Sequence, residues 1–68
     1  MKLTIETDRE EDGRWIAEVP ELPGVVAYGT TQGDAMAKAE ALALRALAEQ
    51  LEHGERRAIA LSITVPAE

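Results

Sequence analysis

The 68-residue chain has no cysteine and no phenylalanine, and it contains one histidine, one tryptophan and one tyrosine. Without cysteine there is neither a disulfide framework nor a thiolate metal site. The lone His53 is too little for a histidine-based zinc site within one chain. No glycine-rich phosphate loop with its lysine occurs, and no nucleophile has a base beside it in a motif. We therefore expect neither an enzyme nor a cofactor.

Basic residues are also scarce, since seven Lys and Arg face thirteen Asp and Glu, for a net charge of −6. This balance repels phosphate backbones, so we expect no direct contact with nucleic acid. It is compatible with a basic protein partner. The N-terminus has no apolar signal core and no apolar run is long enough to span a bilayer. We expect a cytoplasmic protein without membrane contact.

Four stretches are expected to be strands: three alternate as half-buried strands do, and the apolar stretch VVAY is a short strand. The four stretches cover residues 2–8, 14–19, 25–28 and 56–66. Residues 32–53 instead repeat with a helical period, and Thr31 and Gly54 stand where a helix N-cap and a C-terminal stop are expected.

Turn residues separate the first three strands. Gly13 follows Asp12 in a strong hairpin-turn signal, because glycine adopts positive φ freely. Pro20 has no amide donor and should end the second strand. Pro23 presets φ for the next turn, and Gly24 supplies its positive φ.

The element order is therefore β-β-β-α-β within one α+β domain, residues 1–68. A meander followed by a crossover helix should place the last strand parallel to the first. We expect a four-stranded sheet in the order 3-2-1-4, with the helix packed on one face and Trp15 in the core.

Self-association is expected for three reasons. The chain is small, its last strand leaves an apolar edge, and the apolar arc of the helix is wider than one sheet face needs. The alternative for the helix is that alanine simply favours helices and tolerates water. The expected homo-oligomer interface comprises Leu44, Leu51, Leu61 and Ile63.

Carboxylates are the only plentiful catalytic material. Glu6 and Asp8 lie on one strand face, and Glu18 can lie across from them, so a magnesium-dependent nuclease is an alternative hypothesis. Exposed acids on an outer sheet face are more often simply solvated. We expect no metal site and no catalytic residue.

With these features in place, the sequence resembles the HicB-like antitoxin family over residues 3–54. The pattern is an acidic turn ending in Asp-Gly, then Trp-x-Ala-x-x-Pro-x-Leu-Pro-Gly, a Gly-x-Thr and an alanine-rich helix. Its positions are filled by Asp12, Gly13, Trp15, Ala17, Pro20, Leu22, Pro23, Gly24, Gly29, Thr31 and Ala35. Gly13, Trp15, Pro20, Pro23, Gly24 and Thr31 are expected to be structural.

The resemblance implies a partial ribonuclease-H-like fold and an antitoxin that covers the active site of a small basic ribonuclease, a HicA-like toxin. Many family members carry a C-terminal DNA-binding domain, and this sequence ends at Glu68 without one, so operator binding is not expected of it. An orphan oligomeric domain without a toxin is the alternative. The expected partner-binding residues are Glu10, Glu11, Asp12, Ile16 and Glu18.

Overall fold

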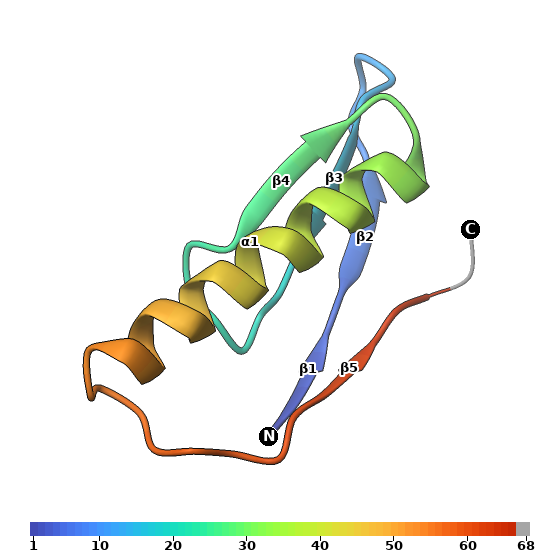
Figure 1. Ribbon diagram of the computed structural model, residues 1–68. Coiled ribbons are helices and arrows are strands. Elements are labelled where there is room, and N and C mark those ends of the chain that lie inside the picture. Colours follow the sequence, from blue (N-terminus) through green and yellow to red (C-terminus); the bar gives the residue numbers. More distant parts are fainter. Residues whose placement is uncertain (67–68) are drawn as a thin grey trace.

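The computed structural model of the protein describes residues 1–66 as one helix and five strands in two sheets (Figure 1). The elements are β1 (Lys2–Thr4), β2 (Glu6–Arg9), β3 (Trp15–Glu18), β4 (Val26–Gly29), α1 (Gln32–Glu52) and β5 (Ser62–Thr64). Strands β2, β3 and β4 form an antiparallel meander, and β1 pairs with β5 in parallel. The α+β class, the meander and the parallel pairing of the chain's first and last strands are confirmed.

The single four-stranded sheet in the order 3-2-1-4 is wrong, because the first expected strand is broken at Ile5 and changes partner there. The β2–β3 register ends at the pair Glu6 and Glu18. Two residues further on, the same register would place Thr4 opposite Pro20, which has no N–H to donate. The ladder therefore ends, and the residues of β1 pair with β5 instead.

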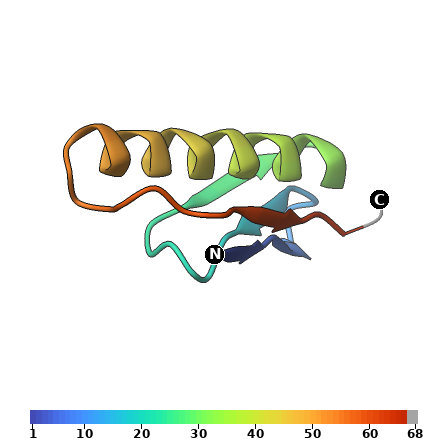
Figure 2. The same ribbon diagram turned by 60° about the horizontal axis from the view of Figure 1, so that its bottom comes forward.

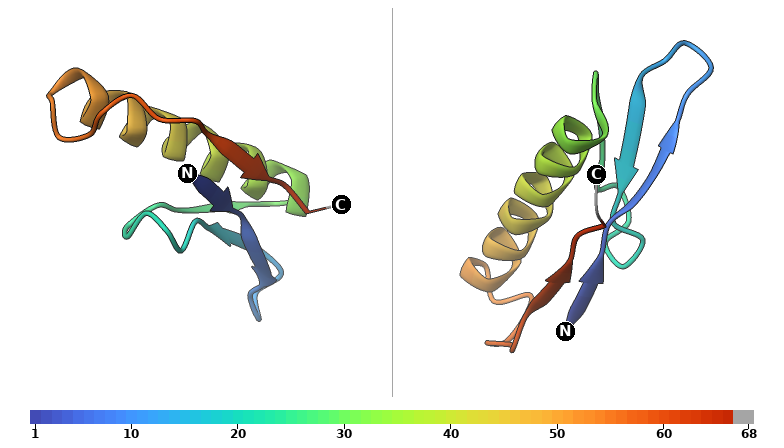
Figure 3. Two further views of the ribbon diagram at one scale, coloured as in Figure 1. Left: turned by 90° about the horizontal axis from the view of Figure 1, so that it is seen from below. Right: turned by 90° about the vertical axis from the view of Figure 1, so that its right-hand side faces the viewer.

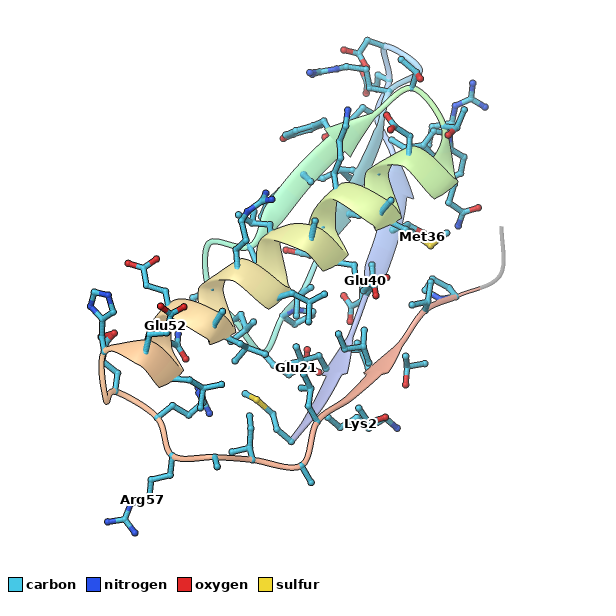
Figure 4. All side chains as sticks on the ribbon, viewed as in Figure 1. Lys2, Glu21, Met36, Glu40, Glu52 and Arg57 are labelled. Carbon is cyan, nitrogen blue, oxygen red and sulfur yellow. The ribbon has the colours of Figure 1, made fainter. Side chains whose placement is uncertain are left out.

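The side chain of Glu21 accepts hydrogen bonds from Thr4, at the end of β1 that β3 does not reach. Its Oε1 accepts from the backbone N–H of Thr4 at 3.0 Å, and its Oε2 accepts from the Thr4 hydroxyl at 2.7 Å (Figure 4). Donation from that N–H, followed by donation from the hydroxyl, holds the pKa of Glu21 below its ordinary value of 4.5. The carboxylate thus supplies the hydrogen-bond acceptor that a neighbouring strand would otherwise provide.

This contact makes the stability of the fold depend on pH in a defined direction. Because the folded pKa of Glu21 is lowered, its contribution is present above pH 4.5 and is lost as the pH falls through the folded pKa. We expect Glu21→Gln to lower the urea midpoint at pH 7, and the gap from the wild type to shrink in acid. Glu49→Gln, at an exposed helix position, is the control and should show no such gap. An equal gap at both pH values would contradict this role.

The last strand is much shorter than expected. Strand β5 covers only Ser62–Thr64, whereas residues 56–61 form no strand. The reason is the parallel register: Lys2 pairs with Ser62, so residues 56–60 lie beyond the start of β1 and have no partner residue there. As a result Ile59 and Leu61 are exposed, and Figure 3 shows the β1–β5 pair continuing beyond the end of the β2–β4 sheet.

Helix α1 begins and ends at well-formed caps. The Thr31 hydroxyl accepts from the backbone N–H of Asp34 at 3.0 Å, and Asp34 places an acid in the positively polarised first turn. At the other end, Gly54 has φ 73°, and the next residue, Glu55, donates its N–H to the Gln50 carbonyl at 2.9 Å. This is a Schellman stop, which satisfies carbonyls that the helix leaves free.

The core lies between α1 and the inner face of the sheet, mainly over β3 and β4. The buried apolar side chains are Leu3, Ile5, Ala17, Val19, Leu22, Val25, Ala35, Met36, Ala39, Ala43 and Leu47. Trp15 is half-buried and packs against this cluster from its edge. The opposite face of the β2–β4 sheet has no layer upon it among residues 1–66 (Figure 2).

Candidate partner-binding surface

The hairpin between β2 and β3 ends in a tight acidic turn, residues 10–13. The N–H of Glu10 donates to the Arg14 carbonyl at 2.7 Å, and the N–H of Gly13 donates to the Glu10 carbonyl at 2.9 Å. Gly13 has φ 91°, a conformation that a side chain would strain. The turn therefore holds Glu10, Glu11 and Asp12 at the tip of a rigid hairpin.

Asp12 is bound within the turn. Its Oδ1 accepts from the backbone N–H of Arg14 at 3.0 Å, and its Oδ2 lies 2.8 Å from Arg14 Nε. The backbone bond, more than the side-chain one, holds the pKa of Asp12 below its ordinary value. The carboxylate therefore stays ionised, and its position is fixed by the chain itself.

The two arginines of the hairpin lie over aromatic rings. The guanidinium carbon of Arg14 is 4.8 Å from the centre of the Tyr28 ring, and that of Arg9 is 5.9 Å from the centre of the Trp15 ring. Such contacts hold a cation close to the protein surface. Among residues 1–66, Glu11 takes part in no ion pair, so the turn presents net negative charge.

The outward side of the β2–β4 sheet continues this acidic surface. We call it the outer sheet face, and it comprises Glu6, Asp8, Ile16, Glu18, Val26 and Tyr28. Across the strands Ile16 stands between Asp8 and Tyr28, and Glu6 stands directly opposite Glu18. A shallow hollow of about 210 Å³ lies over Ile16 and the three acids, and a wider one of about 390 Å³ lies over the hairpin turn.

The arrangement suits a protein surface better than a small ligand or a metal ion. Pockets for drug-sized molecules enclose roughly 300–1,000 Å³ and are mostly apolar, whereas both hollows here are open and acidic. Over residues 1–66 no three carboxylates or histidines come together as a metal-binding group, so Glu6, Asp8 and Glu18 do not form the alternative magnesium site. An apolar centre ringed by acids matches a basic protein.

The facing carboxylates of Glu6 and Glu18 should repel each other, and this repulsion can be tested. Like charges directly opposite on neighbouring strands destabilise a sheet. Removing one by Glu18→Gln should therefore raise the melting temperature of the free protein by a few degrees, most clearly at low salt. Glu49→Gln, on the exposed side of α1, is the control. A lower melting temperature for Glu18→Gln would contradict the repulsion.

The structure brings all five expected partner-binding residues to one end and one face of the sheet. It also adds Val26 and Tyr28, which are exposed on the same face and which no sequence signal singled out, because all of VVAY is apolar or aromatic. The expected oligomer residues divide: Leu44, Leu51 and Leu61 are exposed, whereas Ile63 is half-buried and packs against the chain's own core. No helix within residues 1–66 is both long and apolar enough to cross a membrane.

Comparison with known proteins identifies first the fold and then the family. The N-terminal domain of the antitoxin HicB from Burkholderia pseudomallei superposes with a TM-score of 0.73, over 85% of this chain and 68% of that one, at 24% identity. The chain thus has the fold of that domain. The chain matches no protein-family model.

A UPF0150 protein of Thermoplasma acidophilum is 39% identical to this chain over 70 residues, which cover 98% of this chain and 100% of that protein. The chain therefore belongs to the UPF0150 family, which is the HicB-like family. The resemblance found in the sequence is confirmed.

Proposed function

We propose that this chain is an antitoxin-like protein-binding module that neutralises a small basic ribonuclease, a HicA-like toxin, by covering its active site. The observation that carries the proposal is the pair of acidic surfaces formed by the hairpin turn and the outer sheet face. A ribonuclease must present positive charge to its RNA, so an inhibitor that covers that site is expected to present negative charge. The family to which the chain belongs supports the same role.

The proposed contact has an apolar centre and a charged rim. Ile16 is half-buried, and Val26 and Tyr28 are exposed beside it, so a partner can bury these three side chains. The acids around them fix the partner's orientation and select for basic surfaces. This is the common anatomy of a protein interface, in which apolar and aromatic residues supply affinity and the rim supplies specificity. The module itself needs no cofactor and catalyses no reaction.

The test uses the product of the neighbouring reading frame, if that frame encodes a basic domain of similar or smaller size with a prominent histidine. A variant of it without that histidine should bind this chain in calorimetry, and the active form should stop cleaving RNA when an equal amount of this chain is added. Ile16→Asp, placed at the apolar centre, should abolish both effects while the fold is retained. RNA cleavage that continues in the presence of excess chain would overturn the proposal. Because the proposed ribonuclease acts on cellular RNA, the proposal includes a cytoplasmic location for the pair.

We also propose that the chain associates with copies of itself. The exposed Leu44 and Leu51 on α1 favour this, since they are large apolar side chains that the monomer leaves uncovered. If the neighbouring product does not bind, an orphan oligomeric domain remains as the second candidate function. Light scattering at micromolar concentration tests self-association. A monomeric chain that also fails to bind the neighbouring product would contradict both the antitoxin-like function and the orphan oligomeric domain.

A further inference from the structure

The side of α1 that faces away from the sheet carries an uncovered row of apolar side chains beside a charged row of Lys38, Arg45, Glu49 and Glu52. Figure 2 shows α1 as the outermost layer, with no element on its far side within residues 1–66. On that side Leu44 is 44% exposed and Leu51 is 41% exposed. Neither side chain belongs to the buried core, to which the helix contributes Ala35, Met36, Ala39, Ala43 and Leu47.

The uncovered residues follow a regular spacing. Successive steps of four, three, four and three residues join Ala37, Ala41, Leu44, Ala48 and Leu51, which we call the outer seam. Ala41 is half-buried and the other four are exposed. Alternating steps of three and four keep apolar side chains on one line along a helix, the pattern by which two helices pack side by side. The seam extends for about 21 Å at the usual rise per residue.

The sizes of the seam residues favour one relative orientation of two such helices. When a second copy runs antiparallel, Leu51 of one helix meets Ala41 of the other, and Leu44 meets Ala48. Each large side chain then fills the space over a small one, which gives a close and even packing. In a parallel pair each residue would meet its own counterpart, so alanine would face alanine and leave gaps between the leucine layers.

The charges beside the seam favour the same orientation. Lys38, Arg45 and Glu52 lie along one flank of the seam at steps of seven residues. Only an antiparallel pair brings Lys38 of each copy to Glu52 of the other, twice in each dimer; it also brings the two Arg45 side chains near each other at its centre, so two attractive pairs outweigh one repulsive pair. Within residues 1–66 Glu52 forms no ion pair. Lys38 Nζ lies 3.1 Å from Asp34 Oδ2 of its own helix, and the remaining N–H donors of its ammonium group can reach a second carboxylate.

We propose that two copies of this chain pair through the outer seams of α1, antiparallel, with Lys38 of each copy against Glu52 of the other. This deepens the self-association proposed above and rests on it. The outer sheet face lies on the far side of each copy from the seam, so the dimer presents two acidic surfaces in opposite directions. Each can hold one basic partner, which gives an assembly of two plus two chains.

The first experiment tests the seam itself. Analytical ultracentrifugation should show a dimer for the wild type and a monomer for Leu44→Glu/Leu51→Glu, with dimer affinity weakened on the order of a hundredfold or more by buried charge. Both sites are exposed in the monomer, so circular dichroism should be unchanged. Leu61→Glu is the matched control, because Leu61 is equally exposed, 41%, but lies outside the seam. A monomeric wild type, or a dimer disrupted only by Leu61→Glu, would overturn the proposal.

The second experiment tests orientation, and the absence of natural cysteine makes it clean. Under oxidation Ala41→Cys/Leu51→Cys should cross-link two copies, whereas Ala41→Cys alone should not, because its counterpart lies too far away for a disulfide. Within one helix these two positions are about 15 Å apart and cannot bridge each other. Cross-linking by Ala41→Cys alone would show a parallel pair and refute the arrangement.

The third experiment tests the charges. Lys38→Glu should weaken the dimer by about tenfold, since it places like charges together at both ends, and Lys38→Glu/Glu52→Lys should restore it. Failure of this rescue would contradict the assigned pairing. Binding of the neighbouring ribonuclease should survive every seam variant, because its surface is separate. If the seam variants instead lose the ribonuclease while the wild type is monomeric, the seam is a partner site and this proposal is wrong.

Discussion

Replacing Gly29 with alanine is expected to destabilise the protein more than any other single-methyl substitution in the chain. A Cβ atom at Gly29 would lie 2.5 Å from the backbone nitrogen of Ala35 and 2.7 Å from Asp34 Oδ2. The Asp34 carboxylate can turn aside, but the Ala35 nitrogen is backbone in the first turn of α1 and cannot move without the helix. Accommodation requires α1 to shift from β4, and Ala35 and Ala39 would lose their packing on the sheet.

The expected cost of this shift is about 3 kcal/mol, at the upper end of overpacking substitutions. A chain of this length has roughly 3–10 kcal/mol of stability in total. The melting temperature should therefore fall by about 12–24 °C, and thermal denaturation followed by circular dichroism measures it.

Gly24→Ala is the control that separates crowding from backbone conformation. Gly24 has φ 89°, but a Cβ atom there would meet nothing within 4 Å. Alanine at Gly24 should cost only the left-handed conformation, about 1–2 kcal/mol. If Gly29→Ala melts at or above the temperature of Gly24→Ala, the close approach of α1 to β4 is not a constraint on the fold.

These two glycines also show what the sequence can predict. Gly24 follows proline in a short link between two strands, and that local pattern alone indicates a turn with positive φ. Nothing local indicates that the helix passes close to Gly29, because the contact joins a strand end to a helix start through tertiary packing. The sequence could place Gly29 only as one position in a family pattern.

The break in the first strand has a similar explanation. Periodicity predicted residues 2–8 as one strand, and the burial of Leu3 and Ile5 agrees with its inner face. Alternation does not reveal which neighbour each residue pairs with. That depends on the register that brings Thr4 opposite Pro20, and on Glu21 being close enough to accept the donors of Thr4.

The sequence predicted the acidic character of the candidate surface and some of its residues, but not how far the surface extends across the sheet. The density of acids in the chain indicated the hairpin turn, and strand alternation placed Ile16 and Glu18 on one face. That β4 adds Val26 and Tyr28 to this face could be seen only from the observed register. The helix's surplus apolar arc was also visible in the sequence, but only the fold shows that Leu44 and Leu51 lie away from every other element while Ile63 turns inward.

Reversing the charge of the hairpin turn is expected to slow capture of the proposed ribonuclease by about tenfold or more at low salt. Glu10→Lys/Glu11→Lys places two positive charges where the acidic turn would meet a basic surface. Long-range attraction mainly raises the encounter rate, and salt screens it with a Debye length of about 8 Å at physiological strength. Dissociation should change less, because the apolar centre around Ile16 is untouched. Stopped-flow association and dissociation rates at low and physiological salt measure both effects.

A variant with the same charge change elsewhere shows whether position matters. Glu49→Lys/Glu55→Lys also adds four positive units to the net charge of −6, but near the C-terminal end of α1, which lies at the opposite end of the molecule from the hairpin turn (Figure 1). At that distance screening leaves little interaction with a ribonuclease docked on the acidic turn. Its association should therefore stay close to the wild-type rate and keep the wild-type salt dependence, whereas the turn variant should lose most of that dependence. Equal slowing by both variants would show that only the overall charge attracts the ribonuclease, and that the hairpin turn is ordinary solvated surface.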